Sequence, residues 1–253
     1  MQQAVTTFGS EKNSMITMLG RKDAVKSLKK WFLDGRQAPL VEFAWGSRDV
    51  QLVDGRYAVK VLQQPFALHE YAVTLRAESL SEITPRVGGL LLFENLGSLA
   101  TEYLNGVPLI VLSQQGLGEE DARRIRNGAF HAIGCVHRGN GRHILLHNDL
   151  YGGNFLVMFG KDGVLLGTSD RADVRLIDLE HSAIVKSGKD ALAPMMKDIL
   201  FAMESLKEIG ILSPEDIAEC LEHYLDASQA IGMAKYLLDH SNVNIQSIVC
   251  SSC

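Results

Sequence analysis

Residues 147–154 read HNDLYGGN, and residues 174–180 read VRLIDLE. The first segment carries an aspartate, Asp149, five positions before an amide side chain, Asn154. The second segment reads as a short strand that ends in another aspartate, Asp178. The sequence therefore predicts two carboxylates and one carboxamide, held on a loop and at the end of a neighbouring strand.

The composition argues against several classes of protein. The chain has 253 residues, of which 46% are hydrophobic, so it can bury a substantial core in one domain or two packed lobes. Its net charge of −5 predicts no nucleic-acid partner and no stable association with a membrane. The apolar runs are too short to span a bilayer, and the N-terminus lacks a secretion-signal pattern. We expect a cytoplasmic, intracellular protein, and secretion as an effector stays open as an alternative.

The chain has four cysteines, and their spacing is too uneven for a disulfide framework. Reduced thiols in a cytosol-like compartment are therefore expected. Cys250 and Cys253 lack the second pair that a zinc site needs and the aliphatic residues of a prenylation signal. We interpret residues 241–253 as a frayed tail.

Hydrophobic periodicity divides the rest of the chain. Residues 1–20 are polar and without a period, which favours a flexible leader. An apolar stripe predicts a helix within residues 21–37. Residues 38–104 are strand-rich, and residues 105–240 are mainly helical.

The strand-rich segment is expected to form a small five-stranded antiparallel sheet with one helix. Its predicted strands cover residues 40–45, 50–53, 56–62, 89–94 and 99–104, and its helix covers residues 66–80. The later segment is expected to contain a helix at 119–136, a hairpin at 154–178, and helices at 194–209 and 214–228.

The polar residues match the requirements of phosphoryl transfer from ATP. This reaction needs a group that positions the attacking hydroxyl, a divalent metal that neutralises phosphate charge, and a cation on the phosphates that are not transferred. Asp149 would accept or orient the hydroxyl proton. Asn154 and Asp178 would hold Mg²⁺, with Mn²⁺ as an alternative. Lys60 would contact the α- and β-phosphates.

A buried lysine beside a nucleotide needs a carboxylate partner to keep it charged and oriented. Glu70 is the expected partner of Lys60, because it lies early in the helix that follows the lysine strand. Glu78, later in the same helix, stays open as a rival.

Two further segments are candidate nucleotide contacts. The turn with Gly46 and Ser47 precedes Lys60 and would let backbone amides approach the phosphates. Residues 101–104, which include Glu102 and Leu104, would connect the two lobes and offer backbone groups to the adenine edge. Each segment also has a plain reading, as an ordinary turn and an ordinary strand end.

Taken in order, these elements resemble the protein-kinase-like superfamily over about residues 38–230. The matching elements are Ala58-Val59-Lys60, Glu70, the 101–104 connector, His147-x-Asp149-x₄-Asn154 and Ile177-Asp178. The resemblance implies an α+β, bilobal fold with a small five-stranded antiparallel N-lobe plus one helix and a mainly helical, reduced C-lobe. It also implies a structural role for His147 and a buried anchoring role for Asp198.

The chain departs from conventional protein kinases after the second aspartate. Leu179 and Glu180 replace the usual phenylalanine and glycine, and little room for an activation segment remains before Asp198. Asn148 and the Asp178-x-Glu180 spacing are similar to choline and aminoglycoside kinases, although only 75 residues follow Asp178. The resemblance therefore points to an atypical or minimal protein kinase.

The leading functional hypothesis is an ATP- and Mg²⁺-dependent protein serine/threonine kinase whose protein substrate is unidentified. A small-molecule kinase of the choline or aminoglycoside type and a nucleotide-binding pseudokinase stay open as alternatives. Arg142, Lys186 and Lys189 are either contacts for an acidic or phosphorylated substrate or simply solvated surface charge.

Overall fold

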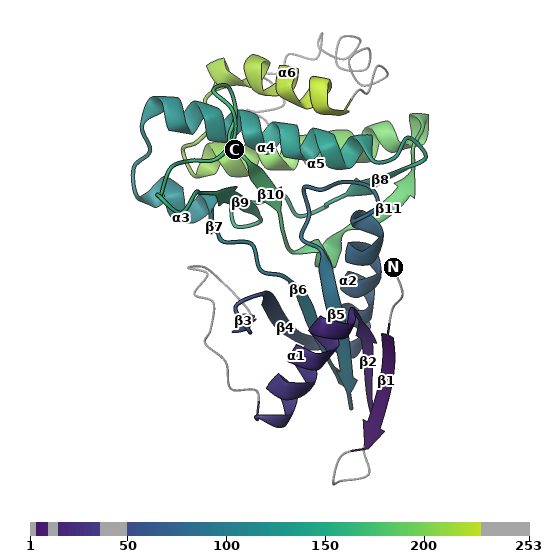
Figure 1. Ribbon diagram of the computed structural model, residues 1–253. Helices are drawn as coiled ribbons and strands as arrows, with labels where there is room; N and C mark the ends of the chain where they lie inside the picture. The colour runs from purple at the N-terminus through teal and green to yellow at the C-terminus, as the bar shows by residue number, and fades with distance from the viewer. Residues whose placement is uncertain (1–3, 10–14, 36–49, 229–253) are drawn as a thin grey trace. The chain divides into compact units, whose positions relative to one another are not determined.

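The computed structural model describes residues 4–9, 15–35 and 50–228 (Figure 1). The chain folds into two compact units. The first contains the residues up to Asn105 and the short segment Asp178–His181, and the second contains the rest. The chain leaves the first unit after Asn105, directly behind the expected connector, and returns to it for only four residues.

The first unit is built on an antiparallel sheet of six strands in the order β1-β2-β5-β6-β4-β3. The strands are β1 (Ala4–Gly9), β2 (Met15–Gly20), β3 (Val50–Val53), β4 (Tyr57–Gln63), β5 (Val87–Phe93) and β6 (Leu96–Glu102). The described residues of this unit form two α-helices, α1 (Lys22–Leu33) and α2 (Gln64–Ala77).

The helices α1 and α2 cover opposite faces of the sheet. Successive side chains of a strand point to opposite faces. Leu91 belongs to the core beneath α1, whereas its neighbour Leu90 packs in the core with α2. Both faces of the central strands are therefore buried, which explains why β5 has no polar face.

The same alternation determines where Lys60 points. Val59 belongs to the core beneath α1, so the next side chain along β4 lies on the face of α2. Lys60 is paired in register with Leu99, which packs with α2. An apolar strand thus carries one cation toward the helix that follows it.

The turn between β3 and β4 follows the expected Asp-Gly pattern. Asp54 and Gly55 both have positive φ angles, of 52° and 62°. The N–H of Arg56 donates to the carbonyl oxygen of Val53 at 3.1 Å. Positive φ at two central residues is typical of tight hairpin turns whose twist matches that of the strands.

One expectation for this unit is wrong. Residues 1–20 were expected to be a flexible leader, whereas β1 and β2 lie in this stretch and extend the sheet. Ile16 and Met18 of β2 are buried and alternate with Thr17. A six-residue strand with two buried apolar side chains is too short for its period to stand out in the sequence. The predicted strand at 40–45 lies outside the described residues.

The second unit is mainly helical, as expected. Its helices are α3 (Leu109–Gln114), α4 (Glu119–Arg138), α5 (Leu192–Glu208) and α6 (Ile217–Ser228), with 3-10 turns η2 (Lys189–Ala191) and η3 (Pro214–Asp216). Its strands are β7 (Gly106–Pro108), β8 (His143–Leu146), β9 (Phe155–Met158), β10 (Val174–Leu176) and β11 (Ala183–Lys186). They form the sheets β10-β9-β7 and β11-β8.

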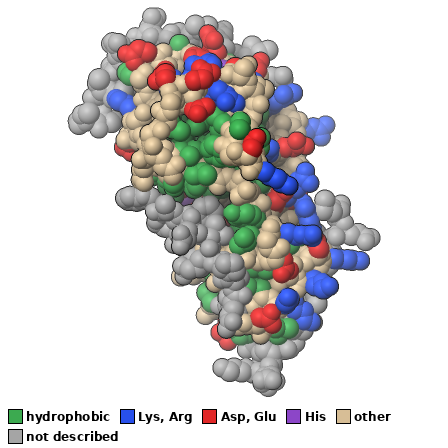
Figure 2. Space-filling view, turned by 60° about the vertical axis from the view of Figure 1, so that its left-hand side comes forward, with side chains coloured by type: hydrophobic (Ala, Val, Ile, Leu, Met, Phe, Trp, Pro, Cys, Tyr) green, Lys and Arg blue, Asp and Glu red, His purple; other side chains and the backbone are tan. Residues whose placement is uncertain are grey.

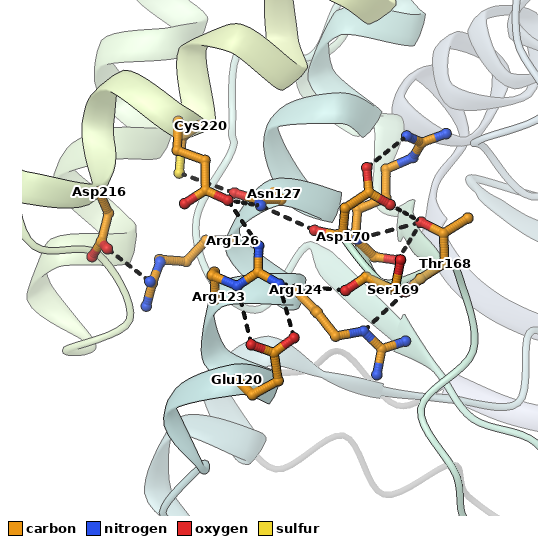
Figure 3. A network of polar contacts seen from close by, with 12 residues as sticks. Glu120, Arg123, Arg124, Arg126, Asn127, Thr168, Ser169, Asp170, Asp216 and Cys220 are labelled. Carbon is orange, nitrogen blue, oxygen red and sulfur yellow. Dashed lines mark hydrogen bonds and ion pairs between the residues drawn. The ribbon is translucent and has the colours of Figure 1, made fainter.

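Helix α4 is the centre of the second unit, and α6 packs along it. Polar side chains fix this pair at one end (Figure 3). Arg126 of α4, which is 5% exposed, donates to Asp216 at 2.7 Å. Asn127 and Arg123 both donate to Glu219, at 2.8 and 2.9 Å. The buried donors Arg126 and Asn127 with their charged acceptors make this contact specific.

The surface of the described residues carries both signs of charge. On the face drawn in Figure 2, exposed hydrophobic side chains lie among acidic and basic groups. Helix α1 exposes lysines on the side away from its buried stripe of Ala24, Val25, Leu28 and Trp31. No helix in the described part of the chain is long and apolar enough to cross a membrane.

The close contact of α4 with α6 depends on Gly134. A Cβ atom there would lie 2.6 Å from the carbonyl oxygen of Tyr224 and 2.7 Å from the Cβ of Ala227. We expect Gly134→Ala to lower the free energy of unfolding by about 1–2 kcal/mol, because the strain exceeds the gain in helix propensity. Urea denaturation followed by circular dichroism measures this change.

The matched control is Gly118→Ala, at a position where a Cβ atom would meet nothing within 4 Å. This variant should lose no more than about 0.5–1 kcal/mol, because alanine is a poorer N-cap residue than glycine but adds no steric contact here. Equal stabilities for the two variants would contradict the close contact.

Candidate active site

Lys60 lies at the centre of a cluster of three carboxylates in the first unit. Its Nζ atom donates to Asp178 Oδ1 at 2.6 Å, to Glu70 Oε2 at 3.2 Å and to Glu180 Oε2 at 3.2 Å. Glu70 comes from α2, whereas Asp178 and Glu180 come from the segment that returns to this unit. One amine thus joins residues that are 10, 118 and 120 positions away from it in the sequence.

Helix α2 packs closely against β6, the strand that pairs with the Lys60 strand β4. Ala67 of α2 lies so near β6 that a Cβ atom on Gly97 would be 2.3 Å from the Ala67 Cβ. Glu70 follows Ala67 by three positions and therefore lies on the same helix face. The returning segment forms the 3-10 turn η1 (Leu179–His181), which packs against α2. The close approach of the α2 and β6 backbones therefore sets the position of Glu70.

Burial and charge compete within the cluster. Burial by itself lowers the pKa of Lys60, but the nearby carboxylates Glu70, Asp178 and Glu180 outweigh this and raise it above its usual value. Burial raises the pKa of Glu70 to about 7, although the ammonium of Lys60 opposes this shift. The lysine is therefore held in its charged form, while one of its partners titrates near neutral pH.

The cluster has more negative than positive charge. When all four groups are ionised, three carboxylates surround one ammonium, and one oxygen from each carboxylate lies within 4.8 Å of the others. Carboxylate oxygens are the ligands that Mg²⁺ and Ca²⁺ prefer. The donor set thus fits a divalent cation, and Asp178, whose side chain is 39% exposed, is the member that solvent reaches most easily.

Asp178 also has an unusual backbone. Its φ angle is 62°, in the left-handed region that aspartate and asparagine tolerate better than most residues. Such a conformation costs free energy and persists where the surrounding structure enforces it, often at functional sites. Here it marks the residue at which the chain re-enters the first unit.

The second unit holds the other expected catalytic residues on the 147–154 loop. Asn154, which is 2% exposed, donates from Nδ2 to the backbone oxygen of Asp149 at 2.8 Å and to its Oδ2 at 3.0 Å. The N–H of Ile177 donates to the carbonyl oxygen of Asn154. The amide therefore closes the loop on the aspartate and fixes the direction of its carboxylate.

A buried carboxylate holds the start of this loop. Asp198 of α5, which is 2% exposed, accepts the N–H groups of His147 and Asn148 at 2.7 and 2.8 Å. His137 of α4 contacts the same carboxylate at 3.2 Å through Nε2. Burial by itself raises the pKa of Asp198, but these hydrogen bonds outweigh it and hold the pKa below its usual value.

His147 and Asn148 have structural explanations within the same unit. His147 is fully buried, and its Nε2 atom lies 2.9 Å from the carbonyl oxygen of Ile177, which it can only approach as a donor. Ser182 Oγ donates to the His147 carbonyl oxygen at 3.1 Å. Asn148 has a φ angle of 61°, which asparagine tolerates well. A turn requirement thus accounts for an asparagine before the aspartate.

The remaining predicted residues fall in different places. The rival Glu78 is engaged by Arg21 at 2.9 Å and by the N–H of Val87, so Glu70 is the residue that pairs with Lys60. Glu102 ends β6 and exchanges backbone hydrogen bonds with its neighbours, and Leu104 follows the strand. Gly46 and Ser47 lie outside the described residues.

The sequence reasoning did not place Glu180 in the site, although it noted the residue as a departure from the family pattern. The signal was its spacing from Asp178. Asp178 directly precedes the 3-10 turn that carries Glu180, and both carboxylates contact Lys60.

Comparison with solved structures identifies the architecture. The chain superposes on WaaP, a kinase-like enzyme solved in complex with acyl carrier protein, with a TM-score of 0.56 and 18% sequence identity. The match covers 96% of this chain and 94% of that one. The chain has a protein-kinase-like fold. This likeness confirms the bilobal kinase-like architecture that the motifs implied.

Other comparisons add less. The pseudokinase domain of BIR2, an immune regulator of the RLK/Pelle family, matches with a TM-score of 0.46 and 17% identity over 76% of this chain and 64% of that one. No protein-family model and no curated protein matches the sequence. In the terms of this kinase-like fold, the first unit is the N-lobe and the second is the C-lobe.

The raised pKa of Glu70 predicts a pH-dependent stability of the N-lobe. The folded chain holds a proton on Glu70 up to a pKa of about 7, whereas the unfolded chain loses it near 4.5. The folded state thus binds more protons in this window, and the contribution of Glu70 to the free energy of unfolding falls as the pH rises from about 4.5 to 7. Glu70→Gln should flatten this profile.

Chemical denaturation of the wild type and the variant at a series of pH values measures the effect. Glu94→Gln removes an exposed carboxylate from the turn between β5 and β6 and serves as the control. The control should keep the wild-type profile. A profile that is unchanged in Glu70→Gln would show that this carboxylate ionises normally.

Asp198→Asn should loosen the 147–154 loop. The substitution removes the negative charge and one of the two acceptors that bind the N–H groups of His147 and Asn148. We expect a loss of about 2–4 kcal/mol in the free energy of unfolding, because buried N–H groups lose a charged partner. The exchange of both amide protons should also become faster.

Hydrogen exchange read by NMR measures the two amides directly. Asp226→Asn, at an exposed position of α6, is the matched control and should leave both the stability and the exchange unchanged. Protection of both amides in the Asp198 variant would rule out the carboxylate as their anchor.

Proposed function

We propose that the chain is an ATP- and Mg²⁺-dependent phosphotransferase that transfers the γ-phosphate to a hydroxyl group, with a serine or threonine of a protein as the acceptor. The observation that carries the proposal is the position of Lys60 among Glu70, Asp178 and Glu180. A kinase-like fold supports phosphoryl transfer in general, but the fold by itself assigns no reaction.

The N-lobe cluster supports nucleotide binding. Lys60 would donate to the α- and β-phosphates, and its contact with Glu70 would keep the amine oriented toward them. Because three carboxylates compete for one ammonium, Asp178 can exchange its contact with the lysine for a contact with a cation. Bound Mg²⁺ supplies charge neutralisation of the phosphate oxygens.

The C-lobe loop supports activation of the acceptor. Asp149 would accept or orient the proton of the attacking hydroxyl. Its carboxylate direction is set by the amide of Asn154, and the loop that carries both is anchored by Asp198. In the proposed reaction Asn154 is also a metal ligand together with Asp178, which requires it to use the amide oxygen that its bonds to Asp149 leave open.

The described C-lobe favours a macromolecular acceptor. Between Asp178 and Ser228 the chain contains only η1, β11, η2, α5, η3 and α6. No inserted helices that could enclose a small metabolite occur in that described stretch. An acceptor hydroxyl presented by another protein does not need such an enclosure.

One observation favours a small-molecule acceptor as the second candidate. Glu180 is 8% exposed and is bound to Lys60, as part of the Asp-x-Glu spacing that is similar to choline and aminoglycoside kinases. The two candidates share the same catalytic residues and differ only in the acceptor.

The test is ATP turnover by the purified protein with Mg²⁺ or Mn²⁺. Intact-mass measurement reports phosphorylation of the protein itself and of proteins in a cell extract, and a metabolite panel reports small acceptors. We expect Asp149→Asn and Asp178→Asn to lower the rate by about 10²–10⁴-fold, as the loss of a group that acts on the transferred proton or on phosphate charge does.

Asp162→Asn is the matched control, because it removes an exposed carboxylate from the turn after β9. It should retain the wild-type rate. Equal rates in the wild type, Asp149→Asn and Asp178→Asn would refute the proposal. Nucleotide binding without turnover under every acceptor would assign the chain to the pseudokinases instead.

A further inference from the structure

The C-lobe contains a pocket of about 670 Å³ that includes none of the catalytic residues described above. Its lining comes from three parts of this lobe: the end of α4 with the turn that follows it (His137–Gly141), the turn after β11 (Ser187–Lys189), and Leu192, Met195 and Ser228. The volume lies within the range of small-molecule sites in proteins.

Cations gather at this pocket. Arg138 and Lys189 both line it, and both are exposed. Among the described residues, no carboxylate forms an ion pair with either of them, although the neighbouring Asp190 is also exposed. Two cations that would otherwise repel each other gain from a shared anion.

The pairing of β8 with β11 brings further basic residues to the same end of the lobe. Lys186 lies opposite His143 in the register of the two strands. The N–H of Ser187 donates to the carbonyl oxygen of Arg142 at 2.9 Å. Arg142 and Lys186, from two separate segments, are thus the chain neighbours of the lining residues Gly141 and Ser187.

Two of the turns that line the pocket require glycine. Gly188 has φ and ψ angles of 152° and −173°, a conformation essentially restricted to glycine. Gly139 has a φ of 55°, and a Cβ atom there would lie 1.9 Å from the carbonyl oxygen of His143. Neither turn could carry another residue without strain. At Gly139 the missing Cβ makes room for the His143 carbonyl oxygen, whereas at Gly188 no atom would lie within 4 Å of a Cβ, so this backbone can approach a ligand closely.

The remaining lining suits the body of a small organic molecule. Leu192 and Met195 lie in the first turn of α5 and supply an apolar wall. Because they mark the amino end of a 17-residue helix, the positive end of its dipole adds to the field of the two cations.

We propose that this pocket binds the phosphate group of a small phosphorylated molecule. Arg138 and Lys189 provide charged donors to phosphate oxygens, and the turn at Gly188 allows close approach of backbone. The volume leaves room for a sugar-sized or amino-acid-sized body against the apolar wall. The site is separate from the proposed phosphoryl transfer, since no residue proposed to contact ATP, metal or acceptor lines it; the one shared side chain, His137, contacts the loop anchor Asp198.

Isothermal titration of the full chain tests the proposal, with glucose 6-phosphate and inorganic phosphate as probes and glucose as the uncharged comparison. We expect saturable binding of the phosphorylated sugar and no binding of glucose. The double variant Arg138→Gln, Lys189→Gln should weaken binding at least tenfold.

The matched control is Lys161→Gln, Lys207→Gln, which removes the same charge from two exposed positions of the C-lobe outside the pocket. This control and Asp149→Asn should both bind as the wild type does. Failure of glucose 6-phosphate to saturate the site, equal weakening in the two double variants, or binding only of a phosphoserine peptide would overturn the proposal. None of these outcomes depends on whether the chain transfers phosphate.

Discussion

The N-lobe site depends on one buried amine that contacts three carboxylates, two more than its single charge can neutralise. Lys60 joins a strand, a helix and a returning segment through three carboxylates. Burial by itself lowers the pKa of Lys60, and the nearby carboxylates outweigh this and raise it. Burial raises the pKa of Glu70 to about 7, with a smaller contribution from the charge of Asp178, and the surplus of carboxylates leaves the cluster able to accept a cation. Stability and readiness to bind therefore oppose each other in the same four side chains.

The C-lobe holds the 147–154 loop through a buried carboxylate. Asp198 does so by accepting two successive backbone N–H groups, and His137 secures that carboxylate from α4. His137 also lines the pocket at the far end of α4, so the loop anchor and the proposed phosphate site share a buried side chain. The two features are thus connected through hydrogen bonds rather than through a change of fold.

Several elements could be predicted because their signals are local. The Asp54-Gly55 turn follows from the conformations that these residues tolerate, and α4 follows from a long apolar period. The pairing of Lys60 with Glu70 followed from the order of strand and helix. The strands β1 and β2 were missed because two buried side chains make too short a period, and Glu180 was missed because its contact with Lys60 spans 120 residues.

The sequence by itself determined the kinase-like order of elements and the polar residues on the 147–154 loop and around Asp178, since turn preferences and hydrophobic periods are written locally. Only the tertiary structure decided which carboxylates reach Lys60 and that Asn148 serves a left-handed turn. It also decided that basic residues from separate segments meet beside one pocket. These outcomes depend on strand register and on how closely backbones approach, which are properties of packed elements and not of neighbouring residues in the chain.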